Sequence, residues 1–439
     1  MILRKTSTTA RFFAITAPFL LFTNGSGAVP AEEWNRTFEG AALFYVVQTH
    51  DEGFIIAGST NYGAWLIKTD PEGHVQWNRT YPTKGIRKVS TARDGGYILR
   101  GVSNDSDFWL MKTDANGQEQ WNRILIVKNN TTFSDIEETS DGGSVIAVVE
   151  HIAPSEKPYW QRVSRLIKVD VSGNEQWNMT FKRQNEFDVR SVQQTKDGGY
   201  VLAGSMTLSP GYYPLPGIPL MDYGNSDAAV IKTDPNGNQQ WEKTFGWWGE
   251  REMAGSVLQT IDGGYVIEGS KAGFSLSPGS DKNYLWLIKT DANGNEQWNR
   301  VLAESWETLD SSILQTSDRG YIFTGYTNHG ADKKHDWLIK TDTNGNLQWK
   351  KVLGGVKKDR AYTIQEISDH VYVLTGFTES YGAGNNDAWL VKIRDTNASG
   401  LETTVIDIND SDEKSTAGFE ILGAMVSVVI LFLLMRERT

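Results

Sequence analysis

The chain has 439 residues, of which 16 are tryptophan, 43 are glycine and none is cysteine. The lack of cysteine excludes disulfides, thiolate nucleophiles and cysteine-ligated zinc or iron–sulfur clusters. The net charge of −11 at pH 7 argues against a basic surface for nucleic acid. We therefore expect no nucleic-acid partner, and nothing in the composition points to a cofactor.

Residues 1–28 have the three parts of a secretory signal peptide. Arg4, Lys5 and Arg11 form a positive start, residues 12–22 are apolar, and small residues follow up to Ala28. An uncleaved N-terminal anchor is the alternative. The pattern predicts that the rest of the chain is exported.

Three sequence boxes recur along the body of the chain and indicate a repeat architecture. They read QTxDGGYVxxGS, WLIKTD and DxNGNxQWNRT. Each box is a short run of Val, Ile, Leu, Tyr or Trp bounded by Gly, Asp or Asn, which is typical of strands joined by tight turns. One unit thus predicts four strands, at residues 256–260, 265–270, 285–290 and 296–301.

Seven such units predict an all-β fold, a seven-bladed β-propeller over residues 33–394. The last unit has no tryptophan-containing fourth strand, whereas Trp34–Phe38 is such a strand with nothing before it. We therefore expect the N-terminal strand to complete the seventh blade and close the ring, which removes free sheet edges. An open tandem array is the alternative.

The repeat places a tryptophan on the fourth strand of each unit, where we expect it to serve blade packing. These residues are Trp34, Trp77, Trp121, Trp177, Trp241, Trp298 and Trp349. The unit resembles the DGGY-type propeller repeats of archaeal and bacterial surface proteins over residues 34–394. The third box also resembles the tryptophan-docking motif of quinoprotein propellers, with an Asp-to-Trp spacing one residue shorter, and this implies packing only. No single activity accompanies such repeats.

The C-terminal part predicts a membrane anchor. An acidic polar stalk at residues 395–416 precedes an apolar run at 417–435, which is long enough for a transmembrane helix. The arginines in residues 436–439 predict a cytoplasmic tail. The run resembles the archaeal PGF-CTERM sorting signal in Gly418 and Phe419, although Ala417 stands where that family has proline. The resemblance implies an archaeal cell-surface protein that an archaeosortase cleaves; a plain transmembrane anchor is the alternative.

Aromatic residues outside the repeat gather in the loops of variable length. These loops connect the second to the third strand, or one unit to the next, and a propeller brings them to one face. We predict that this face binds a glycan or a partner protein, because Trp and Tyr stack on sugars and dominate interfaces. The alternative is that the aromatic residues only pack the loops onto the blades. They are Trp160, Tyr212, Tyr213, Trp247, Trp248 and Trp306.

No motif for catalysis is present: the sequence has no nucleophile elbow, P-loop or dinucleotide fingerprint. We predict no metal site, because His329 and His335 are read as loop residues and the Asp-x-Asn-Gly segments as turns. A glycoside hydrolase is an alternative, because such an enzyme needs a pair of carboxylates and the loops contain several. These are Glu250, Glu252, Glu304, Glu307 and Asp310. We assign no catalytic residue, and a non-enzyme is favoured.

Asn-x-Ser/Thr sequons predict N-glycosylation outside the cell. They begin at Asn35, Asn78, Asn104, Asn130, Asn178 and Asn397. Taken together, the sequence predicts a cell-surface, membrane-anchored β-propeller that acts as a non-catalytic binding or adhesion module. An extracellular polysaccharide hydrolase or lyase and a structural cell-envelope component are the alternatives.

Overall fold

The computed structural model describes residues 30–395 with internal gaps. The gaps are residues 40, 61, 84, 93, 104–106, 126–130, 153–160, 182–185, 208–225, 247–250, 273–282, 306–311, 330–332 and 383–385. The predicted signal peptide, the apolar run at 417–435, the tail and all of the stalk except residue 395 lie outside the described residues. Within the described ranges, no helix has the length and hydropathy needed to cross a membrane.

The described strands form five four-stranded sheets and one eight-stranded sheet. The first sheet contains β2 (Ala41–Gln48), β3 (Phe54–Thr60), β4 (Gly63–Thr69) and β5 (Val75–Tyr81). The second contains β6 (Ile86–Thr91), β7 (Tyr97–Val102), β8 (Phe108–Thr113) and β9 (Glu119–Leu125). The third contains β10 (Thr131–Glu138), β11 (Ser144–Ile152), β12 (Gln161–Val169) and β13 (Glu175–Phe181).

The eight-stranded sheet follows in the chain. It contains β14 (Phe187–Gln194), β15 (Tyr200–Thr207), β16 (Ser226–Thr233), β17 (Gln239–Phe245), β18 (Arg251–Gln259), β19 (Tyr265–Ala272), β20 (Asn283–Thr290) and β21 (Glu296–Ser305). The last two sheets contain β22 (Ile313–Gln315), β23 (Tyr321–His329), β24 (Lys333–Thr341) and β25 (Leu347–Leu353); and β26 (Asp359–Ser368), β27 (Val371–Thr378), β28 (Asp387–Arg394) and β1 (Ala31–Phe38).

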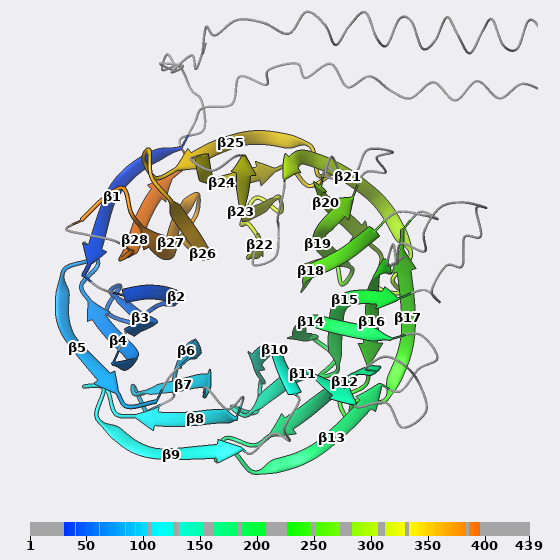
Figure 1. Cartoon of the computed structure of the whole chain (residues 1–439), viewed down its shortest axis with the longest axis horizontal. Helices are drawn as coiled ribbons and strands as arrows, with labels where there is room; N and C mark the ends of the chain where they lie inside the picture. Colours follow the sequence, from blue (N-terminus) through cyan, green and yellow to red (C-terminus); the bar gives the residue numbers. More distant parts are fainter. Residues whose placement is uncertain are drawn as a thin grey trace, which may run out of the picture. The chain divides into compact units, whose positions relative to one another are not determined.

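These sheets are arranged as a propeller, which confirms the all-β propeller and the repeated blades expected from the sequence (Figure 1). The first strand of each set, from β2 to β26, lies toward the centre, and the fourth lies at the periphery. The eight-stranded sheet differs from the expected four-strand units. It consists of two antiparallel runs, β14–β17 and β18–β21, joined by a single parallel pair between Ser226 and Arg251.

The last sheet takes its outermost strand from the start of the chain. β1 pairs antiparallel with β28, with Trp34 opposite Lys392 and Thr37 opposite Trp389. We call the sheet of β26, β27, β28 and β1 the closing sheet. We call each of the other runs of four successive strands a unit, so that the first unit is β2–β5 and the last is β22–β25. The pairing leaves β28 in the interior of its sheet, between β1 and β27.

The hydrophobic core lies between neighbouring runs of four strands rather than within one run. Ile55 and Ile56 are adjacent on β3 and fully buried, but they belong to different clusters because a strand sends successive side chains to opposite faces. The Ile55 cluster includes Leu99 of the second unit, and the Ile56 cluster includes Leu390 of the closing sheet. The first and last sheets therefore share a core, as all the other neighbours do.

Candidate functional site

The fourth-strand tryptophans reach from each unit to the next. The Trp241 ring lies 5.6 Å from the Tyr265 ring in an edge-on arrangement. It also covers Gly294, where an added Cβ would lie 2.7 Å from the indole and where φ is +75°. Glycine suits this turn both for its left-handed backbone and for its contact with the ring. Matching tryptophan–glycine contacts occur at Trp34–Gly73, Trp77–Gly117, Trp177–Gly237 and Trp298–Gly345.

The two remaining fourth-strand tryptophans have other partners. Trp121 packs against the cluster that includes Ile136 of the following unit. Trp349 is buried, and its indole Nε1 donates a hydrogen bond to the Asp395 carboxylate at 2.9 Å. Every fourth-strand tryptophan thus contacts other parts of the scaffold. These contacts explain why the repeat has a tryptophan at this position, with no need for a bound ligand.

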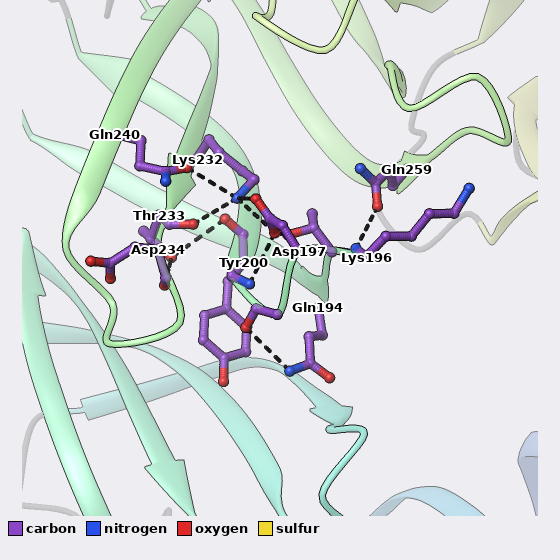
Figure 2. Close-up of polar contacts among 12 residues, drawn as sticks. Gln194, Lys196, Asp197, Tyr200, Lys232, Thr233, Asp234, Gln240 and Gln259 are labelled. Carbon is purple, nitrogen blue, oxygen red and sulfur yellow. Dashed lines mark hydrogen bonds and ion pairs between the residues drawn. The ribbon is translucent and has the colours of Figure 1, made fainter.

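A buried lysine fixes the first turn of a unit to its third strand (Figure 2). In the β14–β17 unit, Lys232 Nζ lies 2.8 Å from Asp197 Oδ2, 2.7 Å from the Thr233 carbonyl and 3.2 Å from Gln240 Oε1. A buried ammonium is expensive unless its donors are satisfied, and here three groups accept from it. We call the lysine–aspartate pair the clamp. The other units contain it at Lys68–Asp51, Lys112–Asp94, Lys168–Asp141, Lys289–Asp262 and Lys340–Asp318.

The clamp keeps its aspartate ionised. Partial burial by itself raises the pKa of Asp197, but hydrogen bonds from Lys232, Thr195 Oγ1 and the Gly199 amide lower that pKa overall. Gly199 is needed because an added Cβ would lie 2.1 Å from the Thr233 carbonyl oxygen. The DGG motif is therefore a structural device, in which the aspartate binds the lysine and the second glycine permits close approach.

The second turn of the unit also has internal hydrogen bonds. Asp234 Oδ1 accepts from the backbone amides of Asn236 and Asn238 at 2.9 and 2.8 Å, which is the pattern of an Asx turn. The aspartate of the DxNG motif thus stabilises the backbone. Over the described ranges, no group of three or more His, Asp or Glu side chains is arranged to hold a metal ion.

Neighbouring units are also linked at the face where these turns lie, which we call the turn face. The Lys196 amide donates to Gln259 Oε1 of the next unit at 2.8 Å, as Figure 2 shows. The Ile261 amide donates likewise to Gln315 Oε1 at 2.8 Å. The same contact joins Ser140 to Gln194, and Ser317 to Glu366. On the turn face, many backbone amides and side-chain oxygens are therefore engaged in hydrogen bonds within the propeller.

The opposite face, which we call the loop face, contains the strand ends that flank the predicted binding residues. Because the strands are antiparallel, β11 ends and β12 begins at this face, as do β15 and β16, and β17 ends there where β18 begins. The predicted aromatic residues Trp160, Tyr212, Tyr213, Trp247, Trp248 and Trp306 lie outside the described residues.

One predicted loop carboxylate, Glu252, is described in full. Its side chain is completely buried at the start of β18, with Oε1 3.6 Å from Lys271 Nζ. The side chains of Glu250, Glu304, Glu307 and Asp310 lie outside the described residues. A buried, ion-paired Glu252 fits a structural role better than general acid or base chemistry on a polysaccharide.

The three described sequon asparagines all lie on outermost strands. Asn78 and Asn178 are exposed on β5 and β13, and Asn35 is half-buried on β1. Asn104, Asn130 and Asn397 lie outside the described residues. The prediction that His329 and His335 are loop residues was wrong: His329 is the last residue of β23, and His335 lies on β24 opposite Thr327, because the two strands extend their pairing further than the repeat pattern indicates.

A polar cluster near the centre of the ring escaped the sequence analysis. Lys88 Nζ on β6 forms an ion pair with the Glu137 carboxylate and donates a hydrogen bond to the Ile136 carbonyl at 3.2 Å. The same ammonium lies 5.4 Å from the centre of the Tyr45 ring. These residues come from three successive units. The cluster therefore ties inner strands together through charge as well as through apolar contact.

Arg100 and Asp135 extend this cluster. Arg100 is fully buried and donates from Nε to Ser144 Oγ and from Nη1 to Ser90 Oγ, both at 2.8 Å. Asp135 accepts from the Val192 amide of the next unit at 2.9 Å, and desolvation raises its pKa to about 6. One signal was present in the sequence: Arg100 occupies a repeat position that holds alanine in three units (Ala57, Ala147 and Ala203) and Glu268, Thr324 or Thr375 elsewhere.

No protein-family model and no curated protein sequence matches the chain. Among solved structures, it is similar to a protein of unknown function from Dyadobacter fermentans DSM 18053 (10% identity, TM-score 0.49, covering 84% of this chain and 99% of that chain). It is also similar to the Neurospora crassa Pan2 WD40 domain (10%, 0.48, 84% and 96%) and to the Dos1 propeller (11%, 0.44, 79% and 77%). At these identities and TM-scores, the similarities do not extend to an activity, a ligand or a partner.

Proposed function

We propose that this chain is a cell-surface, membrane-anchored β-propeller that acts as a non-catalytic binding or adhesion module for a glycan or a surface protein. Counting β14–β17 and β18–β21 as two blades gives a seven-bladed ring closed by β1. The signal-peptide pattern of residues 1–28 and the apolar run at 417–435, with its resemblance to the PGF-CTERM signal, support the cell-surface location.

The contrast between the two faces is the observation that carries this proposal. On the turn face, six clamps and the inter-unit hydrogen bonds direct polar groups inward. The loop face carries the variation in length, which reaches 18 residues between Thr207 and Ser226. Variable loops on a rigid scaffold are where binding sites occur, and Trp247 and Trp248 supply the aromatic surface that sugars and proteins use.

Glycan-array binding by the full-length chain in detergent tests the proposal. We expect binding that the double variant Trp247→Ala/Trp248→Ala reduces at least tenfold. Tyr62→Ala is the matched control, because Tyr62 is an 86% exposed aromatic on the loop face of the first unit. Equal losses in both variants, or binding unchanged by the double variant, would place the ligand elsewhere. Turnover of a polysaccharide by the chain would instead favour the hydrolase or lyase alternative.

A further inference from the structure

Two of the outermost strands, β5 and β13, alternate between half-buried and exposed side chains along their central residues. On β5, Trp77 and Arg79 turn toward the next unit, where the Arg79 guanidinium lies 5.7 Å from the centre of the Trp77 ring. Asn78 and Thr80 lie on the other side of the strand, and both are exposed. The same register on β13 exposes Asn178 and Thr180. The amide and the hydroxyl of each sequon therefore share one solvent-facing surface.

We propose that Asn78 and Asn178 are N-glycosylation sites at the periphery of the ring, which rests on the export that the proposed function requires. The donor is a sugar joined at its anomeric carbon to a lipid phosphate. The Asn amide nitrogen forms a bond to that carbon as the carbon–oxygen bond to phosphate breaks. The lipid phosphate leaves with the electron pair, and the amide proton passes to a base of the transferase. A glycan at these positions projects from an exposed edge strand without displacing any buried side chain.

The register of the other outer strands provides internal controls. Asn122 on β9 and Asn299 on β21 occupy the same exposed position. Two residues later, however, these strands have Ile124 and Val301, which are 63% and 53% exposed, in place of threonine. Without the hydroxyl residue they are not acceptors. The Asn122 and Asn299 amides donate to Glu119 and Glu296 as the Asn178 amide donates to Glu175, so these two positions match Asn178 in strand position, exposure and local hydrogen bond, and differ from it in the sequon.

The sites are confined to one arc of the ring. The sequence contains no sequon between residues 179 and 396, so β17, β21 and β25 carry none. At the position of Asn78, β17 has Glu242 and β25 has Lys350. The unmodified arc belongs to the units whose connections contain Trp247 and Trp306. Asn178 lies on the fourth strand of the unit whose β11–β12 connection contains Trp160.

Local contacts predict an order of occupancy. The Asn178 amide donates to the Glu175 carboxylate, and the Asn35 amide donates to Glu32. On β5 the corresponding residue is Val75, so no such carboxylate competes for the Asn78 amide. We expect occupancy to fall from Asn78 to Asn178 to the half-buried Asn35.

Peptide mass spectrometry on the full-length chain, produced in a host with N-glycosylation and taken from the exported fraction, tests the proposal. We expect sugar on Asn78 and Asn178 and none on Asn122 or Asn299. Thr80→Val should abolish the sugar on Asn78, while Ile124→Thr should create occupancy at Asn122. Far-UV circular dichroism checks that both variants keep the fold.

Two outcomes overturn the proposal and can be told apart. An exported chain without sugar on Asn78 overturns the glycosylation alone. A chain that remains in the cytoplasm, as shown by protection from external protease, overturns both the glycosylation and the proposed cell-surface location.

Discussion

The β14–β17 unit and the closing sheet hold their fourth strand in different ways. In the unit, the Asp234 turn connects β16 to β17, and Lys232 binds Asp197 of the preceding turn. In the closing sheet, the fourth strand is β1, from the other end of the chain. Lys392, at the repeat position of Lys232, lies 3.1 Å from Glu33 of β1 instead. One lysine position thus stabilises a turn in one case and joins the two ends of the propeller in the other.

The difference in burial indicates which contact matters more for stability. The Lys232 side chain is 4% exposed, whereas Lys392 and its neighbour Arg394 are 20% and 49% exposed. The carboxylates differ in the opposite sense, because Asp197 is 55% exposed and Glu33 is 26% exposed, so the comparison depends on the burial of the cations. An ion pair close to water contributes little, while removal of one partner from a buried ammonium leaves an unpaired charge. The local clamp should therefore be the more sensitive of the two to substitution.

The largest expected effect is at the clamp. Asp197→Ala leaves the Lys232 ammonium without its carboxylate, and we expect the free energy of unfolding to fall by about 3 kcal/mol. Asp197→Asn keeps an oxygen for the Gly199 amide and should lose about half as much. Urea unfolding followed by tryptophan fluorescence measures both. Equal, small losses in the two variants would show that the charge of the clamp is unimportant.

A second comparison separates backbone strain from ring contact. Gly294 and Gly263 both have positive φ, +75° and +84°, but an added Cβ meets the Trp241 ring only at Gly294 and nothing within 4 Å at Gly263. Gly263→Ala should lower the free energy of unfolding by about 1 kcal/mol through the left-handed backbone alone. Gly294→Ala should lower it by about 1 kcal/mol more, through overpacking. Similar losses at both sites in thermal unfolding would mean that the indole moves away freely.

A smaller effect is expected at the closing sheet. Glu33→Ala removes the partner of both Lys392 and Arg394, and we expect a loss of about 1 kcal/mol or less because these cations reach water. The same urea titration measures it, with Glu33→Gln as the control that keeps the side-chain volume. A loss as large as that of Asp197→Ala would show that β1 depends on its ion pairs more than on its backbone pairing.

The smallest effects concern pH, and two aspartates should act in opposite directions. Desolvation raises the pKa of Asp135 to about 6, above its value in the unfolded chain, so its contribution to stability increases as the pH falls from 7 through 6. Burial by itself raises the pKa of Asp141, but hydrogen bonds from Thr139, Lys168 and the Gly143 amide lower it to about 2.

The stabilising contribution of Asp141 is present above pH 4 and is lost as the pH falls toward 2. Unfolding midpoints in urea, measured from pH 7 to pH 2, test both signs. Asp135→Asn should remove the gain between pH 7 and pH 5 without changing the loss at acid pH. A gain that persists in this variant would assign the effect to another group.

The sequence was sufficient for the repeated parts of the fold. The DGG and DxNG turns predicted the hairpins because Asp and Gly at those spacings favour short turns, and the incomplete last repeat pointed to the N-terminal strand. The single Ser226–Arg251 pair that merges two units was not predictable, since it depends on two strand ends meeting in space. Neither residue carries a local signal for it.

The central polar cluster was missed for a similar reason. Asp135 follows an irregularity in the pairing of β10 with β11, which interrupts the two-residue alternation on which strand predictions depend. Its hydrogen bond to the Val192 amide and the contact of Lys88 with Glu137 each join two units. Within this cluster, Arg100 stood out in the sequence itself, because a cation occupies a strand position that holds alanine in three other units.

The position of β28 has a mechanical consequence. β28 ends the described propeller at Arg394, yet it lies inside its sheet, with β1 on one side and β27 on the other. Backbone hydrogen bonds in an antiparallel sheet run perpendicular to the strands. Tension applied at Arg394 along the strand therefore loads both ladders of β28 in shear, so that many hydrogen bonds resist it together, whereas an edge strand pulled sideways would unzip one bond at a time.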